Sequence, residues 1–259
     1  MPWGHILSGA LTGLVVGLTG VGGGALMTPL LLLFFGVAPV TAVGTDLWFA
    51  AATKVVASRI HHGEGLIDWQ VVRRLWLGSL TASGMTLLFL RFGPLPARAD
   101  AFLKLAVAVA VLISALGMLL QKRLLAFGLR REGGGWVRFQ GPLTIVAGGL
   151  LGVLVTLTSV GAGALGVVFL VFLYPTRLTA ARLVATDVAH AIPLTLFAGS
   201  AHLIAGHVDW KLLASLLLGS VPAVILGAKL APRLPQTVLR LLLAVLLLFI
   251  GIHLWMSVR

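Results

Sequence analysis

The sequence of 259 residues contains no cysteine and only seven acidic residues. Without cysteine it has no disulfide, no thiolate metal site and no iron–sulfur cluster. It also lacks a serine-nucleophile elbow, an HExxH motif and a P-loop, which excludes the enzyme classes that depend on those motifs. We therefore predict no enzymatic activity and no cofactor, and any transport should be secondary or channel-like because no ATP site is present.

Charged residues of any kind are scarce, at 10%, while hydrophobic residues make up 59% and the mean hydropathy is +1.09. A soluble globular domain carries about 25% charged and about 45–50% apolar residues. This chain cannot build a surface that faces water on all sides. We predict an all-α, polytopic integral membrane protein whose solvent is the lipid bilayer.

The net charge is +12, and the basic residues lie between apolar blocks. This arrangement is typical of topology signals and of contacts with anionic lipid headgroups. No basic, aromatic-interleaved domain is present, so we expect no nucleic-acid partner. The start, Met1 to Gly4, lacks a basic n-region and is expected to enter the first membrane segment directly.

Eight apolar blocks are long enough to be membrane segments, which need about 20 residues. One long polar stretch, residues 121–140, lies at the midpoint of the chain. We divide the chain into a first membrane repeat (1–121), a basic linker loop (122–140) and a second membrane repeat (141–259). The blocks are roughly 4–36, 40–60, 70–91, 99–120, 141–174, 178–203, 210–230 and 236–256.

The two halves of the chain repeat the same residues at a fixed spacing. Nine of the fourteen positions in 13–26 are identical to the positions 139 residues later. Low complexity would align Leu and Ala by chance, but not Asp, His and Trp, so we predict two homologous halves. At a spacing of 141, the matches are Thr45-Asp46, His61, Gly65, Asp68-Trp69 and Gly78-Ser79 with Thr186-Asp187, His202, Gly206, Asp209-Trp210 and Gly219-Ser220.

The first block of each half is interrupted by glycine, at residues 20–24 and 159–163. Because glycine costs about 1 kcal/mol relative to alanine in a helix, we expect each block to break there. Each flank is then too short to cross a bilayer comfortably at about 1.5 Å per residue. Each block is therefore either one long broken crossing or a re-entrant hairpin that returns to its own side.

The distribution of Lys and Arg distinguishes these two topologies. Eight full crossings make the halves parallel repeats and divide the basic residues 11 to 8 between the two sides. Two re-entrant hairpins leave three crossings in each half, make the repeats inverted and divide the same residues 14 to 5. The positive-inside rule favours the inverted repeats, with both termini outside.

The glycine motifs have two interpretations. Glycine allows close packing of helix backbones, as in small-xxx-small contacts. Alternatively, each motif exposes the N-terminus of a half-helix, whose free N–H groups and positive dipole end suit an anion. Broken helices at matching positions of two repeats indicate a transporter binding site, and backbone freed by a break must face protein or a wet cavity.

Two pairs of ionisable side chains lie deep within the second and sixth apolar blocks. Asp46 and Lys54 are eight residues apart, close to two helical turns, and Asp187 and His190 are neighbours at i, i+3. A charge at the bilayer centre costs at least about 2.5–3.5 kcal/mol, so these groups should pair or line a pathway. The structural alternatives are a helix cap or a partner of Lys54 for Asp46, and a hydrogen-bonded core histidine for His190.

The matched residues near block ends have a simpler interpretation. Asp68 and Asp209 are typical helix caps, and the tryptophan that follows each is typical of the membrane interface. His61-His62 resembles half of a metal site, but no carboxylate cluster with a known ligand spacing accompanies it. We expect no bound metal.

The order and duplication of these motifs resemble the TauE/SafE family of sulfite exporters, also called the toluene sulfonate uptake permease family, over essentially the whole chain. In the first half the resemblance rests on Gly20-Val21-Gly22-Gly23-Gly24 to Pro29, Ala42-Val43-Gly44-Thr45-Asp46-Leu47, His61, Gly65 and Asp68-Trp69. In the second half it rests on Ser159-Val160-Gly161-Ala162-Gly163, Ala185-Thr186-Asp187, His190, His202 and Asp209-Trp210. Many members have Ser where Asp46 stands, so Asp46 and Asp187 add acidic groups that indicate a role for protonation.

The resemblance implies a secondary transporter in the cytoplasmic (inner) membrane for a small, often sulfur-containing anion, such as sulfite or an organosulfonate. The proton-coupling candidates are Asp46, Asp187 and His190, since histidine titrates near neutral pH. The substrate, the direction of transport and a homo-oligomeric state stay open. The substrate-binding candidates are Gly22, Gly23, Gly24, Thr45, Lys54, Gly161, Ala162, Gly163 and Thr186.

The main alternative is a cation or metal-ion transporter that uses the intramembrane Asp and His residues as ligands. Replacing Lys54 by Ala separates the two, because it should abolish anion transport and spare cation transport. A membrane enzyme or assembly factor is a third class, and the sequence offers no nucleophile–base arrangement for it.

Overall fold

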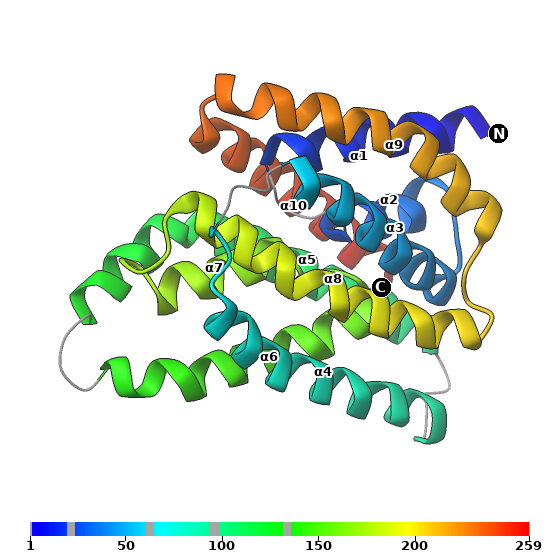
Figure 1. The fold of residues 1–259 in the computed structure, drawn as a ribbon. Coiled ribbons are helices and arrows are strands. Elements are labelled where there is room, and N and C mark those ends of the chain that lie inside the picture. The colour runs from blue at the N-terminus through cyan, green and yellow to red at the C-terminus, as the bar shows by residue number, and fades with distance from the viewer. Residues whose placement is uncertain (1, 20–23, 61–64, 94–98, 132–135, 259) are drawn as a thin grey trace.

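The computed structural model describes residues 2–19, 24–60, 65–93, 99–131 and 136–258 (Figure 1). These residues form helices and their connections, with no strand among them. The helices are α1 (Pro2–Thr19), α2 (Gly24–Phe34), α3 (Pro39–Ile60), α4 (Trp69–Phe92), α5 (Ala99–Arg131), α6 (Trp136–Thr158), α7 (Ala164–Leu173), α8 (Ala180–Ile204), α9 (Trp210–Leu230), the short 3-10 helix η1 (Ala231–Arg233) and α10 (Gln236–Val258).

Seven of the described helices are long and apolar enough to cross a membrane, namely α3, α4, α5, α6, α8, α9 and α10. The apolar parts of α1, α2 and α7 are shorter, between 10 and 17 residues. Since a crossing needs about 20 residues, the short helices must combine with other elements to fill the bilayer. The predicted all-α polytopic architecture is confirmed.

The polar stretch at the midpoint is mostly helical, and the loop is shorter than the sequence predicts. Helix α5 continues to Arg131 and α6 begins at Trp136. Residues 121–131 consist largely of Gln, Lys, Arg, Leu and Ala, which are all good helix formers, so the polar side chains do not end the helix. The guanidinium group of Arg131 also lies over the rings of Phe127 and Trp136.

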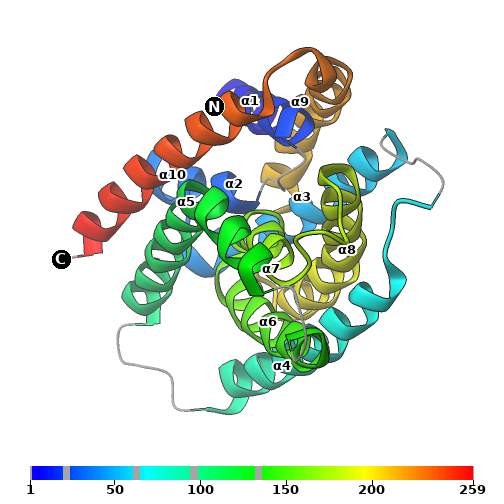
Figure 2. The same cartoon turned by 90° about the vertical axis from the view of Figure 1, so that its left-hand side faces the viewer.

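The first helix of each half packs along a helix of the other half. Both ribbon views show α1 beside α9 and α6 beside α4 (Figures 1 and 2). Glycine makes this possible, because a Cβ atom at Gly13 would lie 2.8 Å from Ser220 Cα, and one at Gly152 would lie 2.8 Å from Ser79 Cα. The structural interpretation of glycine as a close-packing residue therefore applies to these two interfaces.

The Gly13–Ser220 and Gly152–Ser79 contacts are equivalent, because Gly13 matches Gly152 and Ser79 matches Ser220 in the duplicated sequence. Two hydrogen bonds are equivalent in the same way. The backbone N–H of Asp68 donates to Thr186 Oγ1, and the backbone N–H of Asp209 donates to Thr45 Oγ1, both at 3.1 Å. Each bond ties the start of a long helix (α4 or α9) to the first turns of α8 or α3. The matched sequence motifs therefore make matched contacts across the two halves.

In the second half, the chain doubles back after α6. The indole of Trp136, at the start of α6, packs edge-on against Phe172 near the end of α7, with 5.7 Å between ring centroids. Gln140 Nε2 donates to the carbonyl of Leu173 at 2.9 Å. The start of α6 and the end of α7 thus lie at the same end of the bundle, as in a hairpin.

The first half doubles back in the same way at the opposite end. The ring of His5, near the start of α1, lies 4.6 Å from that of Phe35, just after α2. In both halves, the start of the first helix and the end of the second therefore lie close together.

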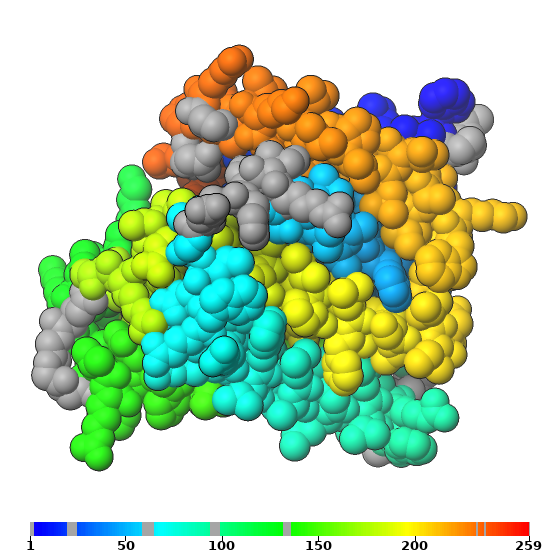
Figure 3. Space-filling view, viewed as in Figure 1, coloured from blue at the N-terminus to red at the C-terminus, as the bar shows by residue number. Residues whose placement is uncertain are grey.

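We call one end of the bundle the basic end. There α4, α6, α8 and α10 begin and α5 and α9 finish, and it lies at the left in Figure 1. It carries most of the cationic side chains of the described residues, whereas the opposite end carries Arg91, Lys104 and Lys211. Figure 3 shows α8 between α9 and α4 on one face of the bundle. The described basic residues at the basic end include Arg73, Arg74, Lys122, Arg123, Arg130, Arg131, Arg138, Arg177, Arg182, Lys229, Arg233 and Arg240.

Candidate functional site

The second half contains a complete break between two helices. Helix α6 ends at Thr158, and α7 begins at Ala164. Within the break, Gly161 and Gly163 have φ values of +124° and +119°, which L side chains rarely adopt, and Ser159 has a positive φ of +59°. The predicted interruption is confirmed here, and it leaves Ala162 buried at its centre.

The matching break in the first half is only partly described. Helix α1 ends at Thr19 and α2 begins at Gly24, so the substrate-binding candidate Gly24 is the first residue of the second half-helix. The candidates Gly22 and Gly23 lie outside the described residues.

Asp187 lies against the first turn of α7. A Cβ atom added to Gly166 would overlap Asp187 Oδ1, so only glycine leaves room for this carboxylate. The backbone amide of Gly163 also faces it. A carboxylate at a helix N-terminus interacts favourably with the helix dipole and the free N–H groups. The break thus presents an anion-binding helix end, and Asp187 occupies it.

Lys54 approaches the same carboxylate from α3, in the other half. Lys54 Nζ lies 3.8 Å from Asp187 Oδ2, and the two side chains are 1% and 0% exposed. At this distance the two groups form an ion pair, but they are too far apart for a hydrogen bond. Neither the ammonium group nor either Asp187 oxygen has a hydrogen-bond partner among the described residues. The pair is therefore fully buried and incompletely satisfied.

His190 lies one helical turn after Asp187 on α8 and is fully buried. Its Nε2 atom lies 2.9 Å from the hydroxyl of Ser79 on α4, while Nδ1 has no hydrogen-bond partner among the described residues. The structure therefore brings together three of the predicted residues, Lys54, Asp187 and His190.

Asp46 has a different environment. Its Oδ2 atom accepts hydrogen bonds from the backbone N–H of Thr28 at 3.1 Å and from the Thr28 hydroxyl, both on α2. The Asp46 carboxylate also lies near Ser159, in the break of the other half. The alternative in which Asp46 pairs with Lys54 is wrong for this structure, because the described ion pair of Lys54 is with Asp187. Eight residues along a helix span about 12 Å, which is too far for direct contact.

The other two substrate-binding candidates, Thr45 and Thr186, are fully buried beside Asp46 and Asp187. Both hydroxyls accept the hydrogen bonds from Asp209 and Asp68 described above. Their first role is therefore to hold α9 and α4 against the centre of the bundle.

The predicted helix caps are confirmed. Asp68 accepts from the N–H of Val71 at the start of α4, and Asp209 accepts from the N–H groups of Lys211 and Leu212 at the start of α9. Asp68 also binds Arg177 through two hydrogen bonds of 2.7 and 2.9 Å, which the sequence does not predict. The matched residue His61 lies outside the described residues.

Sequence reasoning did not identify Thr28, Ser79 or Ser159 as site residues. Each contributes a small hydroxyl group within an otherwise apolar segment. The duplication offered one signal, since Ser79 and Ser220 match across the halves. Both are fully buried, and Ser220 Oγ has no hydrogen-bond partner among the described residues.

Described residues line several cavities, of which three are notable. One of about 560 Å³ lies between α5, α7, α8 and α10, and one of about 280 Å³ adjoins Thr19 at the end of α1. The third, of about 570 Å³, lies between α4 and α8 and includes Arg91 and His202. None of these three is lined by Asp46, Lys54 or Asp187.

Comparisons with known proteins agree with this architecture. The family model described as "Sulfite exporter TauE/SafE" matches residues 5–254. The "Probable membrane transporter protein YjnA" of Bacillus subtilis (strain 168) is 34% identical over 254 residues, which cover 96% of this chain and 98% of the relative. The "Probable membrane transporter protein YdhB" of the same organism is 26% identical over 232 residues, or 89% and 90% of the two chains.

A shorter match also exists. A "Probable membrane transporter protein" of Haemophilus influenzae (strain ATCC 51907 / DSM 11121 / KW20 / Rd) is 36% identical over 77 residues, which cover 27% of this chain and 29% of the relative. No solved structure matches the chain significantly. The match to the family model spans both halves, both glycine breaks and the apolar helices. The chain is thus a multi-pass membrane protein of the sulfite exporter TauE/SafE family.

Proposed function

We propose that this protein is a secondary transporter that moves a small anion, sulfite or an organosulfonate, across the cytoplasmic membrane together with a proton. The observation that carries the proposal is the buried Lys54–Asp187 pair at the N-terminus of α7. It combines a buried cation, a helix end suited to an anion and a carboxylate able to accept a proton.

Lys54 supplies the positive charge for the anion. Its ammonium group is 3.8 Å from Asp187 and makes no hydrogen bond to a described residue, so its three donors are unused. The oxyanion of a substrate placed there would accept from Lys54 and from the N–H groups at the start of α7. Such a substrate would replace Asp187 as the partner of Lys54.

A proton makes this exchange electrically neutral. While Lys54 pairs with Asp187, the two charges sum to zero. When a monovalent anion takes the place of Asp187, the carboxyl group must bind one proton to keep the buried site neutral, because an isolated buried charge is very costly. His190, one turn away with a free Nδ1, is placed to pass that proton. One proton would thus move with each monovalent anion.

The remaining candidates complete the site. Gly161, Ala162 and Gly163 belong to the break beside Asp187, and Gly22, Gly23 and Gly24 would make the matching contribution from the first half. Thr45 and Thr186 position the helices that carry the two carboxylates. In this proposal the repeats are inverted and the basic end faces the cytoplasm, as the positive-inside rule requires.

Lys54 also argues against the cation alternative. A site for a metal ion gathers oxygen and nitrogen ligands around the positive charge, and a lysine ammonium repels it. Here Asp187, whose two oxygens lack a hydrogen-bond partner among the described residues, already faces Lys54.

The proposal is tested by flux in proteoliposomes with radiolabelled sulfite and, separately, with methanesulfonate, which keeps one negative charge at all working pH values. We expect uptake that protein-free liposomes do not show and that external acid stimulates. Lys54→Ala should reduce uptake to background. The matched control is Lys211→Ala, because Lys211 is exposed at the opposite end of the bundle. Absence of flux for every sulfur oxyanion would contradict the proposal.

A further inference from the structure

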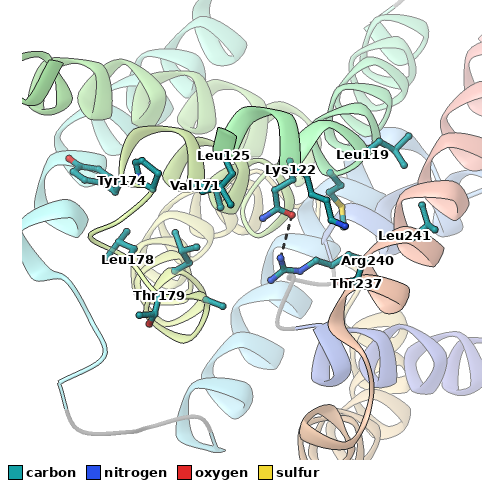
Figure 4. A pocket seen from close by; sticks show the side chains of 15 residues that line it. Leu119, Lys122, Leu125, Val171, Tyr174, Leu178, Thr179, Thr237, Arg240 and Leu241 are labelled. Carbon is teal, nitrogen blue, oxygen red and sulfur yellow. Dashed lines mark hydrogen bonds between the residues drawn. The ribbon is translucent and has the colours of Figure 1, made fainter. Parts of the chain in front are cut away.

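A cavity of about 560 Å³ opens between helices of both halves at the basic end, and neither Lys54 nor Asp187 lines it (Figure 4). It is formed by the last turns of α5, the end of α7, the start of α8 and the start of α10. Its volume lies in the range of about 300–1,000 Å³ that is usual for ligand pockets.

Two basic side chains line this cavity from different helices. Lys122 comes from α5 and Arg240 from α10. Figure 4 shows the Arg240 side chain reaching toward α5, where its guanidinium group donates to Gln121 Oε1 at 3.4 Å. Among the described residues, neither Lys122 nor Arg240 forms an ion pair with a carboxylate. The cavity therefore holds two positive charges that a ligand can balance.

The rest of the wall is apolar. It is built largely from Met118, Leu119, Leu125, Val171, Leu178 and Leu241. Leu119 and Leu241 are also 39% and 54% exposed, so the apolar wall continues onto the outer surface of the bundle. In a membrane that surface faces acyl chains, because the helices that carry it are long enough to span the bilayer.

We propose that this cavity is a binding site for an anionic phospholipid, with the phosphate headgroup between Lys122 and Arg240 and an acyl chain along the leucine-lined wall. Basic pockets between transmembrane helices on the cytoplasmic side favour such headgroups. A small hydrophilic anion would balance the charges but would leave the apolar wall without a partner. A phospholipid has both a charged headgroup for the two basic side chains and an acyl chain for the apolar wall.

The test uses full-length protein purified in mild detergent, with bound lipid measured by native mass spectrometry after titration with phosphatidylglycerol or phosphatidylethanolamine. We expect the wild-type protein to prefer phosphatidylglycerol. The double variant Lys122→Gln/Arg240→Gln should bind it roughly tenfold more weakly, since each basic group near a lipid headgroup contributes on the order of a fewfold in affinity. Binding of phosphatidylethanolamine should change little.

A matched control removes the same amount of charge elsewhere at the basic end. Arg130→Gln/Lys229→Gln changes two exposed residues that do not line the cavity, and it should retain the preference. An equal loss in both double variants would show a diffuse effect of surface charge and would overturn the site. No loss in Lys122→Gln/Arg240→Gln would overturn it as well.

Two further measurements identify the occupant. Leu119→Trp keeps both charges and fills the apolar wall, so it should weaken phosphatidylglycerol binding if the acyl chain lies there. Glycerol phosphate, the headgroup without its chains, should compete poorly. Unchanged binding in Leu119→Trp, or strong competition by glycerol phosphate, sulfite or methanesulfonate, would assign the cavity to a soluble anion and contradict the lipid site.

Discussion

Asp46 and Asp187 occupy matching positions in the two halves, yet their surroundings differ. Asp46 receives two hydrogen bonds from Thr28 of its own half, whereas Asp187 receives none within hydrogen-bond distance from the described residues and faces Lys54 of the other half. One carboxylate is held by hydrogen bonds within its own half, and the other pairs with a cation of the opposite half.

Two substitutions between the repeats account for this difference. Thr28 matches Val167 at the spacing of 139, and valine offers no hydroxyl group to Asp187. Lys54 matches Thr195 at the spacing of 141, and the Thr195 hydroxyl bonds to the carbonyl of Ala191 on its own helix. The two repeats are therefore similar scaffolds, and a few sequence differences give their matched carboxylates different partners.

The largest contrast should appear in transport. Asp187→Asn removes the proposed proton acceptor and the partner of Lys54, so we expect anion uptake to fall at least about 100-fold and to lose its response to a pH gradient. Asp46→Asn should retain a measurable, pH-dependent flux, because Asn keeps an acceptor for Thr28. Uptake of radiolabelled methanesulfonate in proteoliposomes checks both. Equal losses of uptake in the two variants would contradict different roles for Asp46 and Asp187, and would support proton coupling by Asp46 as well.

A second contrast concerns stability. Lys54→Met leaves the Asp187 carboxylate buried without its cation, and breaking a buried pair in this way costs about 3–5 kcal/mol. The double variant Lys54→Met/Asp187→Leu should recover most of that loss, since apolar side chains can replace a buried ion pair. Thermal unfolding in detergent measures both. A double variant no more stable than Lys54→Met would show that the pair does not act as a unit.

Replacing Thr28 by valine, the residue at the matching position of the second half, should make the surroundings of Asp46 more like those of Asp187. Thr28→Val removes the hydroxyl bond to Asp46 and should lower stability by about 1–3 kcal/mol, the usual cost of leaving a buried polar group unsatisfied. Thr53→Val is the control, since that hydroxyl bonds only to carbonyl groups of its own helix. Thermal unfolding would contradict the assignment of Thr28 if the two variants lost the same stability.

The parts of the molecule that are alike in the two halves should respond alike. Gly13→Ala and Gly152→Ala each push a Cβ atom to 2.8 Å from a serine Cα on the neighbouring helix, so each should cost about 1–3 kcal/mol by overpacking. Gly149→Ala should cost less, because the nearest atom to its Cβ is 3.9 Å away. Unfolding temperatures of the three variants test this. A large difference between Gly13→Ala and Gly152→Ala would show that the two interfaces are not equivalent.

Local features of the sequence predicted much of this fold. The glycine-rich break at residues 159–163, the caps at Asp68 and Asp209 and the apolar lengths of the long helices each depend on neighbouring residues, and each is present. Helix α5 is longer than its apolar pattern predicts, because polar residues such as Gln, Lys and Arg also form helices well.

The partners within the site could not be predicted in the same way. Which residue meets Lys54 depends on how α3 crosses α8, and helical spacing alone points to Asp46 on the same helix face. The contacts of Thr28 with Asp46, and of Ser79 with His190, likewise join different helices. Such contacts follow from the packing of the bundle, and a single hydroxyl in an apolar segment gives no indication of its partner.

Whether Asp187 gives up Lys54 to the substrate can be decided by measuring the charge that moves. Methanesulfonate uptake is recorded in proteoliposomes under a potassium diffusion potential without a pH gradient, and then under a pH gradient without a potential. If one proton accompanies each anion, the pH gradient will drive accumulation and the potential will not. Accumulation driven by the potential and indifferent to pH would show that the anion moves alone, and that Asp187 does not take up a proton in exchange.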